Sequence, residues 1–583
     1  MPSIHLHDEL AQVHDRVVVN TRFGPVTGGR ARNGAAVFLG KNIQIANGEP
    51  IRHYTIERSE IPYALPPGRF ENPTPLPSGF RYQDRAYITE SSYAVQPTND
   101  GQAAGIPFRD MAGFGEPTEN SFFLNIVAPP SFPVQSNFAV KIYIHGGFLQ
   151  FGSPHSLGSQ AQYIAAERSE IWVHIGYRLS AFGFLACDNP RIEGNFGFKD
   201  QWVALEWIRD NISAFGGEID GLAGILSSYF SALPFNTTGD PGNIQLTGLS
   251  AGKCYDLYGV HLSVTWEIVG AHSVHQLLHH ASRLPPGVKA PFTSAMLQSN
   301  AIATNPKLLN ELRPQFVALS RALGLDPDAP ETLSVLRDPQ QTSWQSITDL
   351  ICSEKLGPYG TFRGCLDGTW LSDLPDPMTW QRTGGLARGL LEHGVRNVIT
   401  GDLSEEWYLY SIAHPIKRNQ DIQENLERYY SPDIVQRLIE LYGRPADDAK
   451  VEDLEKRFGI ILSAGQVHLP VRLLHRDLLQ ADYPTFRYTI KWTPEQARPN
   501  GYVTHGTDRI LWAFRTPELT ATQAQTARAW LDAIDCATQE LGDPVKRGLR
   551  EVLALRADKG IEWTVDENWD DAMRMRKLLP REL

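Results

Sequence analysis

The sequence has no apolar run long enough to cross a membrane and no concentration of positive charge. Nowhere among its 583 residues do eighteen apolar residues follow one another, so no membrane-spanning helix is predicted. The formal net charge is -12, and the basic residues are interspersed among the acidic ones. These features disfavour nucleic acids and anionic membrane surfaces as partners, and we expect a small-molecule ligand.

Cysteine is also scarce. The five cysteines form neither a Cys-x-x-Cys pair nor a Cys/His spacing, so neither a zinc site nor a disulfide framework is predicted. Whether Cys352 and Cys365 pair is left open. The first residues lack the positive and continuous apolar segments of a secretory signal, and we therefore expect a cytoplasmic protein.

No Pro/Gly/Ser-rich linker divides the chain, so residues 1–583 are expected to form a single domain. Short β-branched and aromatic runs alternate with longer helical patterns, which indicates an α/β protein with a large, mostly parallel central sheet flanked by helices. The runs that we assign to strands are 139–144, 171–177, 243–247, 294–297, 397–400 and 486–492.

The domain is expected to have distinct parts. Residues 16–110 would supply N-terminal strands and loops, 111–300 the core, and 481–583 the C-terminal part of the core. Residues 305–395 and 415–480 are rich in Leu, Glu and Arg at helical spacing. Because ligands of open α/β sheets bind beyond the carboxyl ends of the strands, these two helical excursions are expected to lie over the active site.

A candidate nucleophile follows one of the predicted strands. Gly248-Leu249-Ser250-Ala251-Gly252 has the G-x-S-x-G pattern of a nucleophile elbow, a sharp strand-to-helix turn that exposes the serine. The pattern alone is common in chains of this size, and an ordinary turn is the alternative. Its position after a strand favours Ser250 as a nucleophile.

A glycine pair follows another predicted strand. In His145-Gly146-Gly147-Phe148, the glycines leave backbone N–H groups able to point at a developing oxyanion. We predict an oxyanion hole formed by the amides of Gly146, Gly147 and Ala251.

The base and the acid should follow the serine in the order that this kind of site uses. His505, in a loop after the last predicted strand, is the predicted general base. Three carboxylates follow the strand at 397–400, and loop geometry decides which one meets the imidazole. We favour Glu406, with Glu405 and Asp402 as alternatives.

A group of histidines competes for a functional role. His272, His275 and His279 share one helical face, and His280 lies beside them. Position 276 is Gln, so the H-E-x-x-H arrangement of zinc enzymes is absent, and a packed helix face is predicted instead of a metal site.

Short motifs are spread over nearly the whole chain. They occupy residues 61–64, 66–70, 119–125, 145–148, 177–183, 195–200, 214–217, 248–252, 296–299 and 505–508. Together they resemble the type-B carboxylesterase family, the cholinesterase-like group that includes fungal lipases. The resemblance implies the α/β-hydrolase fold and an esterase whose acid is Glu406, at a site where the family reads Asp-Glu-Gly and this chain reads Glu405-Glu406-Trp407. Leu249 stands where cholinesterases have Glu, and Ser121 replaces a cysteine that forms a disulfide in secreted members.

Three stretches do not fit the family pattern. Residues 40–59, 218–239 and 253–270 interrupt motifs that join well without them. Each begins with a glycine followed by Lys or Glu, if the preceding glycine is counted for the second and third stretches, and such codons can contain a splice-donor sequence. We therefore suspect insertions that are short introns translated from an unspliced transcript, with genuine loops as the alternative. The third stretch would separate the elbow from the helix that supports it.

The predicted activity is hydrolysis of a carboxylic ester through an acyl-enzyme, without a metal or organic cofactor. Apolar side chains at Phe148, Leu149, Leu249 and Trp407 are expected near the nucleophile as a substrate pocket. The alternatives are a non-catalytic or impaired cholinesterase-like protein, its elbow disrupted by residues 253–270, and an acyl transferase that uses an alcohol or amine in place of water.

Overall fold

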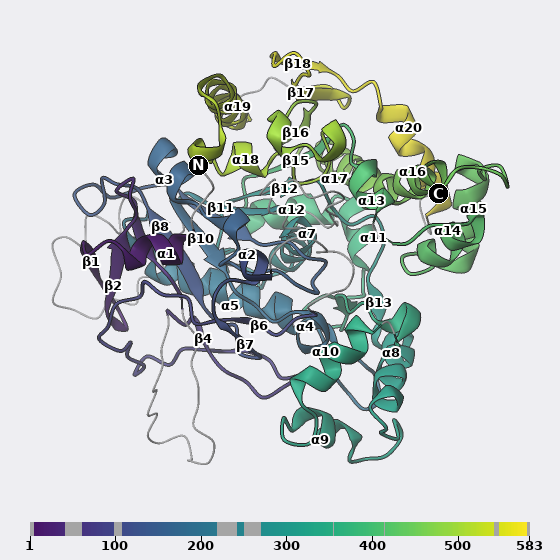
Figure 1. Ribbon diagram of the computed structural model, residues 1–583, viewed down its shortest axis with the longest axis horizontal. Helices are drawn as coiled ribbons and strands as arrows, with labels where there is room; N and C mark the ends of the chain where they lie inside the picture. Colours follow the sequence, from purple (N-terminus) through teal and green to yellow (C-terminus); the bar gives the residue numbers. More distant parts are fainter. Residues whose placement is uncertain are drawn as a thin grey trace.

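The structure is a computed structural model that describes residues 5–40, 61–97, 108–217, 242–249, 270–353, 355–412, 414–541 and 547–579. A twelve-stranded sheet runs through this described part of the chain (Figure 1). In spatial order its strands are β1 (Arg16–Thr21), β2 (Gly24–Arg30), β3 (Ala36–Phe38), β8 (Leu124–Ala128), β10 (Ile171–Ile175), β9 (Val140–Ile144), β11 (Ile244–Leu249), β12 (Ser294–Gln298), β15 (Asn397–Leu403), β16 (Thr485–Ile490), β17 (Glu551–Leu555) and β18 (Ile561–Val565).

The strands from β10 to β17 are parallel, and the antiparallel pairs lie at the two edges. All six strands predicted from the sequence belong to the parallel part. Their residues are mostly apolar because both faces are covered, as in β10 and β12, where every residue is buried. The predicted α/β-hydrolase fold is confirmed.

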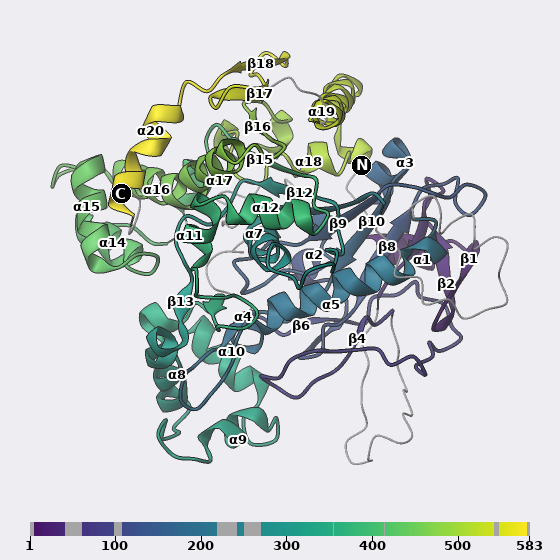
Figure 2. The ribbon, with the colours of Figure 1, turned by 180° about the vertical axis from the view of Figure 1, so that it is seen from behind.

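Successive residues of the central strands face two separate cores. In β9, Ile142 and Ile144 pack in one core with α5 (Phe196–Asn211) and α7 (Gly270–Ala281), whereas Tyr143 packs in the other with α3 (Gln162–Arg168) and α19 (Ala521–Glu540). Figures 1 and 2 show α3 and α19 at the top and α5 below. The alternation follows from the two-residue period of a strand, and it places helices on both faces of the sheet.

The two helical regions of the sequence form several helices. They are α8 (Leu309–Ala322), α9 (Thr332–Arg337), α10 (Trp344–Cys352), α11 (Pro377–Arg382), α12 (Gly385–Glu392), α14 (Asn419–Leu426), α15 (Pro432–Tyr442), α16 (Val451–Ser463) and α17 (Leu469–Gln480). In both ribbon views, α8 to α10 form one lobe and α14 to α16 another (Figures 1 and 2). By contrast, α12 packs against α7, and α17 packs against β15 and β16. Both regions therefore end in a crossover helix, which the next parallel strand requires.

For each of the first two suspected insertions, the described residues before it and after it lie beside the same stretch of chain. This stretch includes β8 for the first insertion and β9 for the second. The Gly40 amide donates to Asn125 Oδ1 of β8 at 2.8 Å, and Pro62 forms a bridge with Phe123 of the adjoining segment. Likewise, Gly217 forms a bridge with Phe138, and the Val140 amide of β9 donates to the Asn243 carbonyl at 3.0 Å. The residues between these ends lie outside the described part of the chain.

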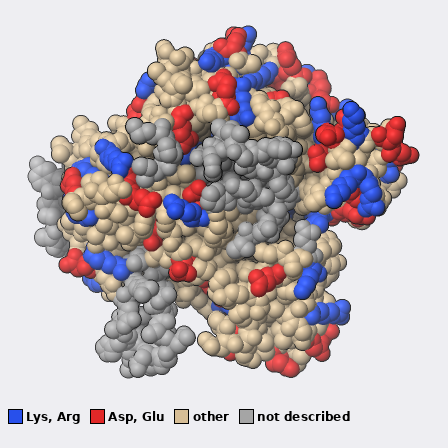
Figure 3. All heavy atoms as spheres, in the orientation of Figure 1, with Lys and Arg blue, Asp and Glu red and all other residues tan. Residues whose placement is uncertain are grey.

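Several surface and covalent features complete the description. Lys and Arg side chains are interspersed with Asp and Glu over the face seen in Figure 3. Among the described helices, none combines the length and apolarity that a membrane crossing needs. Cys352 and Cys365, whose pairing the sequence left open, are both free thiols.

Candidate active site

The predicted elbow lies at the carboxyl end of β11, in the middle of the sheet. β11 ends at Leu249, and Ser250 and Ala251 lie outside the described residues. Helix α7 begins at Gly270, against the end of β11. A Cβ added to Gly270 would lie 2.0 Å from the Ile144 carbonyl oxygen and 2.6 Å from Gly248 Cα. The end of β11 and the start of α7 therefore meet as closely as a strand-to-helix elbow requires.

The predicted oxyanion loop follows β9, the neighbour of β11. Gly147 has φ +113°, and a Cβ there would lie 1.7 Å from the Phe151 carbonyl oxygen, so only glycine fits. Within the described part of the chain, neither the Gly146 amide nor the Gly147 amide donates to a backbone carbonyl. These two N–H groups are therefore available to an oxyanion beyond the end of the strand.

The His145 ring and the Tyr177 hydroxyl hold the glycine pair in place. The His145 ring stacks on Tyr177 with centroids 4.5 Å apart, and its Nδ1 lies 2.9 Å from the Gly146 carbonyl oxygen. The Tyr177 hydroxyl donates to the His145 carbonyl at 3.0 Å. Burial lowers the pKa of His145 to about 4, so the ring is neutral at physiological pH.

The residues after the glycine pair have a strained backbone. Phe148 and Leu149 both have positive φ, which is rare for side chains of this size. Gln150 Nε2 donates to the Phe148 carbonyl at 3.0 Å, and the Ser180 amide donates to the Leu149 carbonyl at 2.6 Å. Both apolar side chains are buried in the core that contains α5 and α7. These bonds hold the loop in a conformation that the chain would not adopt alone.

Glu406 and His505 meet in the interior. Glu406 immediately precedes α13 (Trp407–Ser411), and His505 lies in the loop after β16. His505 Nδ1 lies 2.5 Å from Glu406 Oε2, and both side chains are fully buried. The Leu403 amide donates to the other carboxylate oxygen, Oε1, at 3.0 Å. The carboxylate therefore fixes the imidazole orientation and is itself fixed by the end of β15.

The second ring nitrogen of His505 points away from this pair. His505 Nε2 is buried and has no hydrogen-bond partner in the described part of the chain. The Tyr410 ring packs edge-on to the imidazole, with centroids 5.7 Å apart. The arrangement leaves one imidazole nitrogen for proton transfer while the other is held by Glu406.

The other two candidate carboxylates have different partners. Glu405 Oε2 accepts from the Val503 amide at 2.7 Å. Asp402 Oδ2 lies 2.7 Å from Arg472 Nη1 and 2.9 Å from His468 Nδ1. Although burial alone would raise its pKa, Arg472 and His468 hold the pKa of Asp402 well below its usual range. Of the three carboxylates, only Glu406 is within hydrogen-bond distance of His505.

The remaining predicted pocket residues lie in different places. Leu249 is fully buried in the core that contains α3 and α19. Trp407 lines a cavity of about 280 Å³ together with Asp402 and Arg472, and neither Glu406 nor His505 lines that cavity. The structure therefore does not bring Leu249 and Trp407 into one pocket.

The histidine face on α7 is engaged in ordinary packing. His275 Nε2 lies 2.9 Å from Gln381 Oε1, and the Ile302 amide donates to His275 Nδ1 at 2.8 Å. His280 Nδ1 lies 2.9 Å from the Trp370 carbonyl oxygen. No set of three or more His, Cys, Asp and Glu side chains within the described ranges is arranged to hold a metal ion.

Two glutamines that the sequence analysis did not single out support the oxyanion loop. Gln150 is one, and Gln96 is the other: its Oε1 accepts from the Gly152 amide at 2.8 Å, and its Nε2 donates to the Gly152 carbonyl at 3.1 Å. Asp508 was also missed as a separate residue, although it belongs to the His505-Gly-Thr-Asp motif. Trp512 Nε1 donates to it at 2.7 Å, and burial raises its pKa to about 6. The glutamines have no motif that would have identified them.

Comparison with known proteins shows which family this chain resembles. A model of the carboxylesterase family matches residues 25–221. An esterase/lipase of Schizosaccharomyces pombe is 27% identical over 93% of this chain and 95% of that protein. A carboxylic ester hydrolase of Gibberella moniliformis is 27% identical over 92% of this chain and 93% of that protein.

Among solved structures, PNB esterase superposes with a TM-score of 0.65 and 19% identity, covering 96% of this chain and 99% of that one. At this identity the likeness shows the fold. The family model over residues 25–221 and the esterase relatives that span nearly the whole chain confirm the resemblance read from the sequence, and they indicate a carboxylic ester hydrolase.

Proposed function

We propose that this protein hydrolyses small-molecule carboxylic esters through an acyl-enzyme on Ser250, with His505 as general base and Glu406 as the acid that orients it. The observation that carries the proposal is the buried pair of Glu406 Oε2 and His505 Nδ1, 2.5 Å apart, with His505 Nε2 left without a described partner. A carboxylate on one ring nitrogen selects the tautomer whose other nitrogen accepts a proton.

In the proposed first step, the Ser250 oxygen attacks the ester carbonyl carbon while its proton moves to His505 Nε2. The carbonyl oxygen becomes an oxyanion, which accepts from the amides of Gly146, Gly147 and Ala251. When the intermediate collapses, the carbon–oxygen bond to the alcohol breaks, and the alcohol leaves with the proton from His505.

In the second step, water attacks the acyl group on Ser250 and gives its proton to His505 Nε2. Collapse of the second intermediate releases the carboxylic acid and returns the proton to the serine oxygen. Throughout the cycle, Glu406 stabilises the imidazolium. Every proton is carried by His505, so the proposed cycle draws on no metal or organic cofactor.

Buried apolar side chains in the oxyanion loop favour an ester with an apolar acyl group. Phe148 and Leu149 are 5% and 2% exposed and immediately follow the proposed oxyanion donors. A longer acyl chain transfers more of its own apolar surface out of water when it binds beside this loop, which makes binding more favourable. We therefore expect kcat/KM to rise from acetyl to longer acyl groups in a series of 4-nitrophenyl esters.

Labelling with a fluorophosphonate probe tests the nucleophile. We expect the protein to react with the probe and Ser250→Ala to abolish both labelling and ester hydrolysis. Ser353→Ala, at an exposed serine after α10, is the matched control and should leave both unchanged. Labelling that persists in Ser250→Ala would rule out this serine, and a chain that neither labels nor hydrolyses esters would favour the non-catalytic alternative.

A further inference from the structure

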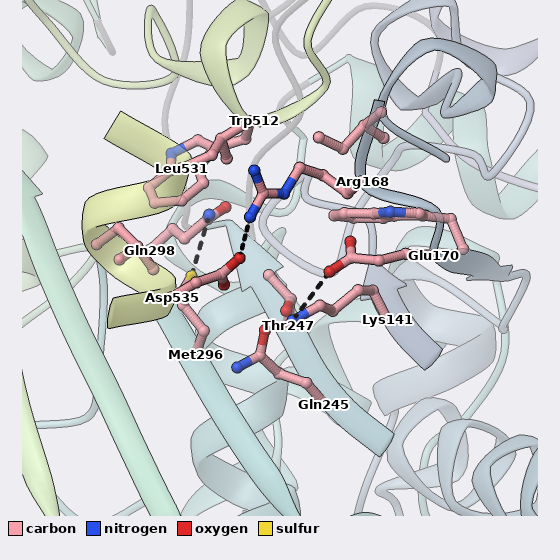
Figure 4. Close-up of a pocket in the computed structure, with 13 residues that line it drawn as sticks. Lys141, Arg168, Glu170, Gln245, Thr247, Met296, Gln298, Trp512, Leu531 and Asp535 are labelled. Carbon is pink, nitrogen blue, oxygen red and sulfur yellow. Dashed lines mark hydrogen bonds and ion pairs between the residues drawn. The ribbon is translucent and has the colours of Figure 1, made fainter. Parts of the chain in front are cut away.

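The pocket in Figure 4 lies between the central strands of the sheet and helices α3 and α19. Its volume is about 40 Å³. Ion pairs surround it: Lys141 Nζ lies 3.6 Å from Glu170 Oε1, and Arg168 pairs with Asp535 of α19. A volume of this size suits a few water molecules and excludes an organic ligand.

A larger cavity lies at the lobe formed by α8 to α10. Its volume is about 370 Å³, which is within the range of small-molecule sites. The cavity lies between the α8–α10 lobe and the core, and we call it the arginine cavity. The residues that define it are Arg69, Glu119, Arg178, Phe182, Arg337 and Trp344. None of the residues proposed for catalysis lines it.

Two of the three arginines are fully engaged by the protein. Arg69 forms a bidentate pair with Glu119, and its Nη1 donates to the carbonyls of Leu336 and Thr342, both at 2.7 Å. Arg178 forms a bidentate pair with Asp200 at 2.6 and 2.8 Å. Bidentate geometry and burial hold both guanidinium groups in place, so they form fixed walls of the cavity.

Arg337, the last residue of α9, is not engaged in this way. Its single side-chain bond in the described chain is from Nη2 to the Phe70 carbonyl, at 3.3 Å, the long end of the range. Its Nε is buried without a partner, and no described carboxylate lies within ion-pair distance of the guanidinium. Arg337 therefore lines the cavity with no described carboxylate to balance its guanidinium charge, and an anion in the cavity would supply one.

The lining favours an anion and an apolar body together. Arg69 and Arg178 are each paired with a carboxylate, Glu119 and Asp200, so Arg337 carries the unpaired positive charge of the described lining. Trp344 and Phe182 add aromatic surface, and Pro67 and Pro339 are apolar neighbours. A planar guanidinium recognises the planar carboxylate group in a two-bond geometry, whereas the rings cover an apolar body.

We propose that the arginine cavity binds a small organic carboxylate, with the carboxylate on the Arg337 guanidinium and its aromatic or aliphatic body against Trp344. The site is separate from ester hydrolysis, because its lining includes neither Glu406 nor His505. A neutral molecule of the same shape leaves the charge of the Arg337 guanidinium unbalanced and binds more weakly.

Calorimetric titration of the full chain with sodium benzoate tests the proposal, with benzamide as the neutral isostere and inorganic phosphate as an anion without an apolar body. We expect benzoate to bind about tenfold or more tightly than either, the size of a hydrogen-bonded charge pair. Equal affinity for benzamide would refute the charge recognition. Equal affinity for phosphate would refute the role of the aromatic wall.

Substitution at Arg337 provides the second test. We expect Arg337→Gln to weaken benzoate binding at least about tenfold, because the charged fork is lost. Arg321→Gln, at an exposed arginine in the last turn of α8, is the control and should bind as the original chain does. Thermal melting shows whether each variant is folded. Arg337→Lys keeps the charge but not the fork, and it should fall between the two; unchanged benzoate affinity in either Arg337 variant would overturn the proposal.

Discussion

The pair of Glu406 and His505 permits a sharp test of the proposed mechanism. Glu406→Gln keeps the size of the side chain and an oxygen for the Leu403 amide. It removes the negative charge 2.5 Å from His505 Nδ1, in a site from which water is excluded. The new amide group also stabilises the wrong imidazole tautomer, the one with an unprotonated Nδ1, because its NH₂ can donate to that nitrogen.

The expected loss follows from these two effects. In serine proteases, replacing the corresponding carboxylate with an amide lowers kcat about 10⁴-fold. This corresponds to about 5 kcal/mol of transition-state stabilisation. Because Glu406 and His505 are fully buried, the charge is not replaced by solvent, and we expect a loss of similar size in kcat with little change in KM.

Glu405→Gln is the matched control, one residue away. Its side chain accepts from the Val503 amide, which a glutamine oxygen can also do, so kcat should stay within about twofold. Steady-state hydrolysis of a 4-nitrophenyl ester is the assay, in the full chain and in a chain without residues 253–270. The reasoning is refuted if Glu405→Gln loses as much activity as Glu406→Gln, or if Glu406→Gln keeps more than a tenth of it.

Three further predictions concern the loop, a buried acid and the suspected insertions. Gly147→Ala should lower kcat about 100-fold, because the new Cβ meets the Phe151 carbonyl and displaces an oxyanion donor; Gly24→Ala, at similar φ but in open space, should retain activity, and equal losses would contradict this. Burial raises the pKa of Glu90 to about 8, so the folded state binds the proton more tightly than the unfolded state and loses stability as pH rises from about 4.5 to 8. The melting temperature of Glu90→Gln minus that of the original chain should therefore grow from pH 5 to pH 9, and a constant difference would be evidence against it. Deleting residues 253–270 should preserve the fold and raise kcat/KM, and the mature transcript should lack the codons for all three stretches; a transcript that carries them contradicts the splicing hypothesis.

The central strands could be predicted because their environment leaves a simple pattern. β10 and β12 are buried on both faces, and most of their residues are apolar, apart from His174 in β10 and Ser294 and Gln298 at the ends of β12. The edge strand β18 is partly exposed, and its pattern resembles that of many surface segments. The pattern of the helical regions indicated the lengths of the helices but not what they pack against. The crossover helices α12 and α17 could therefore not be distinguished from the helices of the two lobes.

For a different reason, local sequence alone left three carboxylates open, and the preference for Glu406 rested on the family resemblance. Asp402, Glu405 and Glu406 lie within five residues, and each accepts hydrogen bonds from a different part of the chain. Arg472, which engages Asp402, is seventy positions away, and no local pattern links the two. The same holds for Arg337, whose cavity is made by segments far apart in the chain. Motifs identify such residues, but long-range packing decides what each one does.

The register of β3 refines the boundary of the first suspected insertion. Ala36, Val37 and Phe38 pair in turn with Ala128, Val127 and Ile126, and continuing this register brings position 40 opposite Leu124. A Cβ at that position would lie 2.5 Å from the Leu124 carbonyl oxygen, so the position requires glycine. Removing residues 41–60 in place of 40–59 deletes the same length but keeps Gly40 there, with Ile61 and Pro62 continuing along β8. The packing therefore favours the later boundary.

The start of α7 makes a similar demand at the third stretch. Position 270 requires glycine, because a Cβ there would overlap the Ile144 carbonyl and Gly248 Cα. When residues 253–270 are removed, Gly252 directly precedes Ala271 and takes this position. The last glycine of the G-x-S-x-G motif is then required for the same physical reason as Gly270. Both positions would lie in the close contact between the end of β11 and the first turn of α7. For a chain without residues 253–270 we therefore predict that Ser250 lies in the two-residue turn between β11 and α7, beside the Gly146 and Gly147 amides.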